Sequence, residues 1–314
     1  MLAAWTLFLF LVWSNSFVAI GYLLGSDAAP ARFDWVGLTA ARFAPAAVIA
    51  LAYCFLRRRA QALALVRAHP LRLLVCGLCG VPAYNLALYY GQQHGVPAPV
   101  ASLTTTLAPL FLLILGAVFL GERLTARRAL GFLVALAGMV LIAGAKERGD
   151  ERPYALLLMI TAVAPLSWSI YSAASKPVVA RSPVTWTFLA IGAGTLPLFA
   201  VLPFRGGPQM LALDAPGWAA LLFLSLGCTV LGFAVWTWLL KHLPASTVGF
   251  AVFLNPPLTT VSKATLALLL PATFAFTILP REWAGGAVVL GGVAIALAPR
   301  ATAGRPPPSA SAGG

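Results

Sequence analysis

Ten long apolar segments, separated by short charged or Pro/Gly-rich connections, constrain this chain more than any other feature. The hydrocarbon core of a bilayer requires about 20 apolar residues per α-helix, and the segments approach or exceed that length. Only 9% of the 314 residues are charged, against about 25% in soluble domains, so the surface must be solvated by lipid. The sequence therefore predicts an all-α integral membrane protein. Its ten transmembrane helices are expected at residues 2–24, 36–56, 73–92, 97–120, 127–145, 154–175, 184–204, 216–240, 245–268 and 283–299.

Lys and Arg are distributed unevenly over the alternating connections. The connections after the second, fourth, sixth and eighth segments, with the tail, hold 13 of them, and the other connections hold 6. Basic residues gather in cytoplasmic loops, so both termini are expected in the cytoplasm of a protein of the inner, or plasma, membrane. The net charge of +13 is therefore interpreted as an orientation signal and not as a nucleic-acid surface. The Pro/Ser/Gly-rich tail, 300–314, is expected to be disordered.

The two halves of the chain share short matches in the same order. Offsets of 155, 147 and 154 residues superpose Trp13-Ser14 on Trp168-Ser169, Ala108-Pro109 on Asn255-Pro256, Tyr89 on Trp236, and Gly131 and Gly138 on Gly285 and Gly292. Five helices per half is an odd number, so the second half enters the membrane from the opposite side. The sequence thus predicts inverted five-helix repeats at 1–145 and 154–299, joined by an outer loop at 146–153. Such repeats hold substrate near the bilayer midplane and expose it alternately to each side.

Several stretches carry a resemblance to a known family. They are WSNSF, ALYYGQQHGVPAPVASLTTTLAPLFLLILGAVFLGERLT, GFLVALAGMVLIA, SWSIYS, AVWTWLLKHLPASTVGFAVFLNPPL and GGAVVLGGVAIAL. Over nearly its whole length the chain resembles the EamA-type transporters of the drug/metabolite transporter (DMT) superfamily. The resemblance implies a ten-helix exporter or permease for amino acids or other small metabolites. Its central cavity would lie among the first, third, fourth, sixth, eighth and ninth helices.

The second half departs from this pattern because it has no counterpart of Gly121-Glu122-Arg123. Three interpretations of residues 257–282 stay open: a ninth helix extended or broken near Pro271, which we favour, an eleventh span at 264–280, or a reading-frame irregularity. Glu122 itself, beside Arg123 at the cytoplasmic end of the fourth helix, is expected to be a structural and gating residue.

No motif for catalysis, a cofactor or a metal emerges from the sequence. No GxxxxGK[ST] or HExxH is present, and the CxxC of Cys76 and Cys79 lies in an apolar segment without a second pair. We therefore expect a transporter that is not an enzyme, with a small-molecule substrate and the lipid bilayer as its partners. Export of an amino acid or a similar amphipathic solute is favoured. The alternatives are a permease for drugs or sugar conjugates, a membrane scaffold and a lipid-modifying enzyme. The oligomeric state is not indicated.

Amide, hydroxyl and aromatic side chains within the predicted helices form the candidate site. Asn85, Tyr89 and Gln92, for example, share one helix face. The competing interpretations are helix packing for Ser and Thr and interfacial belts for Trp and Tyr. The predicted substrate-binding residues are Trp13, Asn15, Asn85, Tyr89, Gln92, Ser102, Thr106, Trp168, Tyr171, Trp236 and Asn255.

Four further residues are assigned structural or gating roles: Glu122, Pro109, Pro256 and Arg42. Arg42 lies within the second helix, and we expect its long side chain to snorkel to the outer surface. The alternative is a group that attracts anions at the outer mouth. Lys263, in the ninth helix, is expected to reach the outer interface as well.

Overall fold

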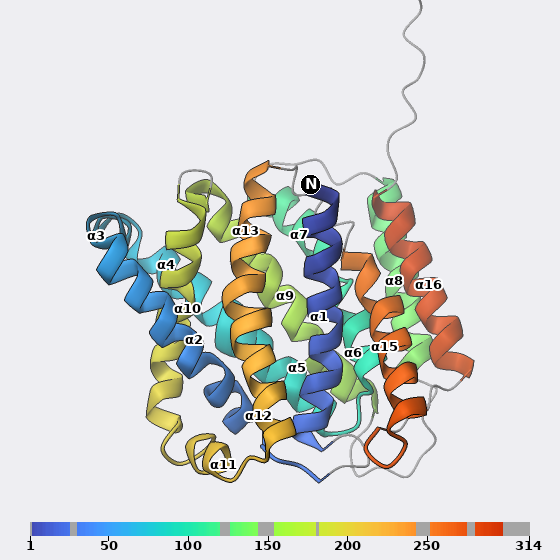
Figure 1. Cartoon of the computed structure of the whole chain (residues 1–314). Helices are drawn as coiled ribbons and strands as arrows, with labels where there is room; N and C mark the ends of the chain where they lie inside the picture. Colours follow the sequence, from blue (N-terminus) through green and yellow to red (C-terminus); the bar gives the residue numbers. More distant parts are fainter. Residues whose placement is uncertain are drawn as a thin grey trace, which may run out of the picture.

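A computed structural model of the chain describes residues 2–25, 30–119, 126–143, 154–179, 182–242, 252–274 and 280–297. Helices and turns, without strands, make up these ranges (Figure 1). Within the described ranges, six stretches are long and apolar enough to cross a membrane: Leu2–Leu24, Trp35–Arg57, Pro70–Gln93, Tyr154–Val179, Pro183–Val201 and Ala215–Leu239. Shorter apolar helices cover Ala98–Leu112, Ala129–Gly138 and Trp283–Gly292. The described chain is thus that of an all-helical membrane protein, and its division into ten spans stays a prediction.

The elements follow the chain in the order shown by the colours of Figure 1. They are α1 (Leu2–Leu24), α2 (Trp35–Arg57), α3 (Arg59–Ala68), α4 (Pro70–Leu78), η1 (Cys79–Ala83), α5 (Tyr84–Gln93), α6 (Ala98–Thr105), α7 (Ala108–Phe119), α8 (Ala126–Ala143), α9 (Tyr154–Val179), α10 (Pro183–Val201), α11 (Gly207–Leu211), α12 (Ala215–Leu222), η2 (Phe223–Leu231), α13 (Gly232–His242), η3 (Val252–Leu254), α15 (Asn255–Leu269) and α16 (Pro280–Leu297). The longer helices stand side by side, with α3 at one edge of the bundle and the α8–α16 pair at the opposite edge.

Prolines interrupt two of the predicted helices in different ways. The segment predicted as one helix at 97–120 is broken, because α6 ends at Thr105 and α7 begins at Ala108. Pro109 lacks an amide hydrogen, and in a continuous helix its ring would clash with the carbonyl of Thr105, which is four residues earlier. Pro82 instead lies inside η1, a π-helical turn that keeps Pro70–Gln93 continuous. A second π-helical segment, η2, lies at the corresponding place in the other half, immediately before α13.

The region that departs from the repeat contains a helix break. Helix α15 ends at Leu269, and residues 270–274 are not helical. Pro271 follows two residues after the helix, as is common where a proline prevents its continuation. The described part of 264–280 therefore contains the end of α15 and a turn before α16, and 275–279 lie outside the described residues. This arrangement fits the interpretation of a break near Pro271 and not a separate span.

Helices of the two halves meet through reciprocal contacts. A Cβ atom added to Gly138 would lie 2.7 Å from the carbonyl oxygen of Gly285, and one added to Gly292 would lie 2.6 Å from that of Gly131. The serine pair shows the same exchange. Ser14 donates to the Asn255 side chain at 3.2 Å, and Ser169 donates to the Ala108 carbonyl at 2.8 Å. The sequence repeat pairs Gly138 with Gly292 and Gly131 with Gly285, and it pairs Ser14 with Ser169 and Ala108 with Asn255. Within each pair of contacts, the second contact is therefore made by the repeat counterparts of the residues that make the first.

Candidate functional site

A cavity lies among α1, α2, α5, α6, α7, α9, α13, η3 and α15. It encloses about 70 Å³, which is room for several water molecules. Its lining consists of Trp13, Ser16, Phe17, Ile20, Arg42, Tyr84, Asn85, Leu88, Thr105, Ala108, Pro165, Trp168, Phe233, Val252 and Asn255. The cavity is thus walled mainly by apolar and aromatic groups with a few polar side chains, as small-molecule sites usually are.

Trp13 and Trp168 form the centre of the aromatic wall. Their ring centroids are 5.8 Å apart and the planes are perpendicular, an edge-to-face arrangement that aromatic pairs prefer. Phe233 and Trp236 contact both tryptophans. Trp13 Nε1 donates to the carbonyl of Cys228 at 3.0 Å, which fixes the orientation of the indole. The wall is therefore a packed cluster, and its rings are held by one another.

Arg42 supplies the charge of the cavity. Arg42 is only 6% exposed, and three neutral acceptors from other helices surround its guanidinium. Nε donates to Thr229 Oγ1 at 2.9 Å, and Nη1 donates to Tyr89 Oη at 2.5 Å and to Asn85 Oδ1 at 3.4 Å. The prediction that Arg42 snorkels to the outer surface is wrong. The acceptors on α5 and η2 hold the side chain within the bundle through its Nε and Nη1 atoms.

The acceptors around Arg42 are themselves oriented by their own helices. Asn85 Nδ2 donates to the carbonyl of Val81 in η1, so its amide oxygen is directed to the arginine. The hydroxyl of Thr229 donates to the carbonyl of Leu224 within η2, five residues earlier, and so presents a lone pair to Nε. Both π-helical segments thus contribute to the arginine site, in line with the frequent occurrence of such segments at functional sites.

The sequence of α2 explains how Arg42 reaches this position. Asp34 caps the helix, since its side chain accepts from the amides of Val36 and Gly37. Several buried residues near Arg42 are small, including Ala41 and Ala44, which lets neighbouring helices approach closely. The start of α2 and its packing face are therefore both fixed. Lys263 is also buried, so the expectation that it reaches the outer interface is wrong too.

Asn255 represents the polar part of the cavity on α15. Its Oδ1 accepts a hydrogen bond from Ser14 of α1, and Thr259, one turn later, donates to the carbonyl of Ser14 at 3.1 Å. These bonds join α15 to α1 beside the aromatic wall. The Asn255 amide is therefore held at the cavity lining by its contact with Ser14.

The structure brings together five of the residues singled out from the sequence: Trp13, Arg42, Asn85, Trp168 and Asn255 line the cavity. The other singled-out residues that the structure describes lie outside its lining. Tyr89 holds Arg42, while Tyr171 and Trp236 pack behind Trp168. Gln92 donates to the carbonyl of Phe17.

The hydroxyl and amide groups that remain bond to their own helices or begin a helix. Asn15, Ser102 and Thr106 donate to nearby carbonyls, those of Leu11, Pro99 and Leu103. Pro109 and Pro256 lie in the first turns of α7 and α15. Glu122 lies outside the described residues.

Ten lining residues were not singled out from the sequence: Ser16, Phe17, Ile20, Tyr84, Leu88, Thr105, Ala108, Pro165, Phe233 and Val252. Helical periodicity carries part of the signal, since Ser16 and Ile20 follow Trp13 by three and seven residues and Leu88 follows Asn85 by three. Most of the others are apolar. An apolar side chain in a membrane helix packs equally well against lipid and against a cavity wall, so its sequence gives no indication of which it faces.

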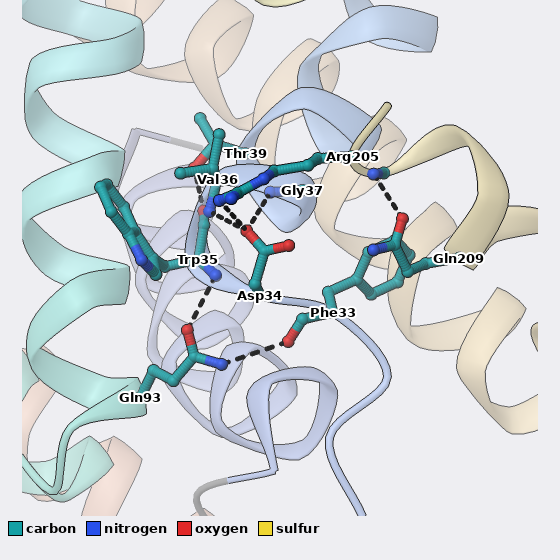
Figure 2. A network of polar contacts seen from close by, with 10 residues as sticks. Phe33, Asp34, Trp35, Val36, Gly37, Thr39, Gln93, Arg205 and Gln209 are labelled. Carbon is teal, nitrogen blue, oxygen red and sulfur yellow. Dashed lines mark hydrogen bonds and ion pairs between the residues drawn. The ribbon is translucent and has the colours of Figure 1, made fainter. Parts of the chain in front are cut away.

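A second polar cluster joins the start of α2 to the turns before α11 and α12, and Figure 2 shows its part around Asp34, Gln93 and Arg205. We call it the outer clamp, after the side of the membrane on which the predicted topology places it. It consists of the ion pairs Arg32–Asp214 at 2.9 Å and Arg205–Asp34 at 3.8 Å, together with Gln93, which contacts the backbone of residues 33 and 35. The Arg32 guanidinium holds the pKa of Asp214 below its ordinary value, helped by the amide of Gly217. The same pairing raises the pKa of Arg32.

Within the described ranges, no group of three or more His, Cys, Asp or Glu side chains is arranged to hold a metal ion.

Comparison with known proteins adds a family and named relatives. The model of the EamA-like transporter family matches residues 3–144 and 154–298. The chain is 32% identical over 270 residues to a "Probable terminal-alkyne amino-acid exporter" of Streptantibioticus cattleyicolor, covering 82% of this chain and 83% of that protein. It is 30% identical over 216 residues to a "Probable amino-acid metabolite efflux pump" of Escherichia coli, covering 64% and 69%.

Two further similarities concern an exporter and a fold. The chain is 28% identical over 198 residues to the "Aromatic amino acid exporter YddG" of Ancylobacter novellus, covering 62% of this chain and 68% of that protein. A solved structure titled "Crystal structure of protein" matches with a TM-score of 0.59 and 25% identity, covering 94% of this chain and 96% of the matched one. The same fold therefore extends over nearly the whole length.

Proposed function

This chain belongs to the EamA-like transporter family, and from that premise we propose that it exports an amino acid with an apolar side chain, or a similar amphipathic solute. The resemblance found in the sequence is confirmed by the family match, and the chain is a multi-pass membrane transporter. The observation that carries the finer proposal is the composition of the cavity. It combines an aromatic wall with the guanidinium of Arg42 and the amides of Asn85 and Asn255.

The chemistry of this cavity suits an amphipathic solute. The rings of Trp13 and Trp168 offer an apolar surface, while Arg42, Asn85 and Asn255 offer hydrogen bonds. A sugar conjugate needs many polar partners, and a large drug needs more space than the cavity has in this conformation. The names of the relatives, which include exporters of aromatic and terminal-alkyne amino acids, point to the same class.

Alternating access is the proposed mechanism, with inverted repeats at 1–145 and 154–299. The reciprocal contacts of Gly138 with Gly285 and of Gly131 with Gly292 support it, because a two-fold axis between repeats generates contacts in such pairs. Trp13 and Trp168, counterparts in the repeat, touch one another, as residues on the axis would. Rocking of the two halves about this axis would expose the cavity to one side of the membrane at a time.

The orientation also belongs to the proposal. Both termini, including the tail at 300–314, would be cytoplasmic, and the loop at 146–153 would lie outside; these segments lie largely outside the described residues. Single cysteines placed at two exposed positions test this in a background without other cysteines. A membrane-impermeant thiol reagent added outside should label Leu211→Cys and not Arg59→Cys, and the reverse result would invert the orientation.

Flux of an apolar amino acid through the cavity is the central test. Purified protein in liposomes should exchange radiolabelled L-phenylalanine or L-leucine with saturable kinetics. Ala108→Leu would fill part of the cavity and should lower this flux at least tenfold per folded protein. Ala4→Leu makes the same change at an exposed position of α1 and should leave the flux unchanged.

Two outcomes would contradict the proposal. Equal flux in Ala108→Leu and Ala4→Leu would mean that substrate does not pass through this cavity. Flux of a hydrophobic dye such as ethidium, without any amino-acid flux, would favour the drug permease instead.

A further inference from the structure

The cavity holds a positive charge that no residue in the described part of the chain neutralises. Arg42 is the only Arg, Lys, Asp or Glu among the described lining residues, and its described partners Thr229, Tyr89 and Asn85 are all neutral. A guanidinium stays protonated under all physiological conditions. Burying a charge without a counter-charge lowers stability, and a neutral side chain of similar size would avoid that loss. The arginine therefore needs an explanation beyond packing.

The hydrogen bonds of Arg42 leave one side of its guanidinium available. Nε and Nη1 are bonded to protein, whereas Nη2 makes no hydrogen bond with the residues that the structure describes. The bonded nitrogens fix the plane of the group and so the direction of Nη2, and Arg42 is one of the residues that line the cavity. A fixed guanidinium of this kind matches the planar geometry of a carboxylate, and a charge-assisted bond to it is about twice as strong as a neutral one.

The other lining groups do not offer a matching site for a cation. The described lining contains no carboxylate. The rings that would attract an ammonium group are those of Trp13, Trp168 and Phe233, and they contact one another edge to face within the packed wall. An ammonium group in the cavity would also be repelled by Arg42. The cavity is thus electrostatically selective for an anion.

We infer that Arg42 binds the carboxylate of the transported solute, so the protein accepts apolar carboxylates whether or not they carry an amino group. This inference rests on the proposed transport of a solute through the cavity, and it narrows the substrate class. Amino acids, N-acylated amino acids and simple arylalkanoic acids share the chemistry that Arg42 recognises. Amines of the same size and shape do not.

Three probes with the same phenyl group separate the possibilities: L-phenylalanine, 3-phenylpropionate and 2-phenylethylamine. Their affinities for the purified protein are measured by the shift of its melting temperature with ligand concentration. We expect both carboxylates to stabilise the wild type, and the amine to give no shift. In Arg42→Gln the carboxylate affinities should fall ten- to a hundredfold, the factor that corresponds to one hydrogen bond to a charged group.

Two matched variants keep the test independent of folding. Arg32→Gln makes the same substitution at the outer clamp, where the guanidinium is paired with Asp214, and should keep carboxylate affinity within twofold of the wild type. Arg42→Lys keeps the charge and should retain the preference for carboxylates over the amine, with weaker binding. The ligand-free melting temperature of Arg42→Gln should equal or exceed that of the wild type, since an unpaired buried charge has been removed.

The inference is overturned if 2-phenylethylamine stabilises the wild type as strongly as 3-phenylpropionate, or if Arg42→Gln binds the carboxylates as tightly as the wild type does. A lower ligand-free melting temperature of Arg42→Gln, with no carboxylate shift in the wild type, would make the arginine a structural residue. The proposed transport can be refuted independently of this inference. If carboxylates bind through Arg42 but show no saturable flux in liposomes, the proposed function is refuted and the inferred binding by Arg42 stands.

Discussion

Arg32 and Arg42 lie close together in the sequence, and the structure gives them opposite surroundings. Arg32 precedes α2 and binds Asp214 through Nε and Nη2, at 3.2 and 2.9 Å, with its guanidinium over the ring of Tyr22. The side chains of this pair are 18% and 52% exposed. Arg42 lies within α2, is 6% exposed and has neutral partners in the described chain.

The difference between the two arginines separates a structural charge from an available one. In the outer clamp the carboxylate that neutralises Arg32 comes from the protein, so the pair is complete and joins two loops. Exposed ion pairs of this kind contribute little to the free energy of unfolding. At the cavity no described carboxylate accompanies the arginine, and its charge remains for an anion that enters. Arg32 thus joins two loops of the protein, whereas Arg42 is inferred to bind the carboxylate of the solute.

The largest expected effect comes from the aromatic wall of the cavity. Trp13→Ala should lower the free energy of unfolding by about 3–5 kcal/mol, as truncation of a core tryptophan does, because Trp13 packs against Phe10, Trp168 and Trp236. The yield of monodisperse protein and its melting temperature measure this. Trp283→Ala, at a position that is 55% exposed, is the control. Equal effects of the two substitutions would show that the cavity wall is not a packed core.

An intermediate effect is expected at the residue that positions Arg42. Tyr89→Phe removes one acceptor from the guanidinium and should cost about 1.5–3 kcal/mol, the usual range for a hydrogen bond to a charged group. Carboxylate affinity should fall, but by less than in Arg42→Gln, because the charge is retained. Tyr53→Phe serves as the control, since the Tyr53 hydroxyl makes no hydrogen bond to any described residue. Unchanged stability in Tyr89→Phe would mean that Arg42 does not depend on this contact.

The smallest effect is expected in the outer clamp. Asp214→Asn retains the side-chain oxygen that caps α12 and removes only the charge that pairs with Arg32. Transport and carboxylate affinity should stay within twofold of the wild type, and the small difference in melting temperature should shrink in high salt.

The pH dependence of the outer clamp follows from the lowered pKa of Asp214. Ionised Asp214 stabilises the folded protein above about pH 3.8, where the aspartate of the unfolded chain is also ionised. This contribution is lost as the pH falls through the lower pKa that Asp214 has in the folded state. The melting curves of the wild type and Asp214→Asn should therefore differ at neutral pH and converge below pH 3.8. A difference that persists in acid would show that the amide perturbs more than the charge.

The sequence by itself determined the membrane class, the family and much of the helix pattern. The low charge content and the apolar segments require lipid as the solvent, and the described helices follow most of the predicted segments within a few residues. Local chemistry also placed part of the cavity, since Trp13, Asn85, Trp168 and Asn255 are polar or aromatic groups that a lipid-facing surface disfavours. Their positions could be found because such groups stand out in an apolar helix.

Only the tertiary structure decided the surroundings of Arg42 and the apolar part of the cavity. A single arginine near a helix end can reach the interface or turn inward, and the sequence of α2 is compatible with both. The choice depends on Thr229, Asn85 and Tyr89, which come from elements distant in the sequence. Apolar lining residues such as Phe17 and Leu88 have no signature, because lipid and protein interior are equally apolar. The packing of helices against each other, and not their composition, determines which of these side chains enclose a site.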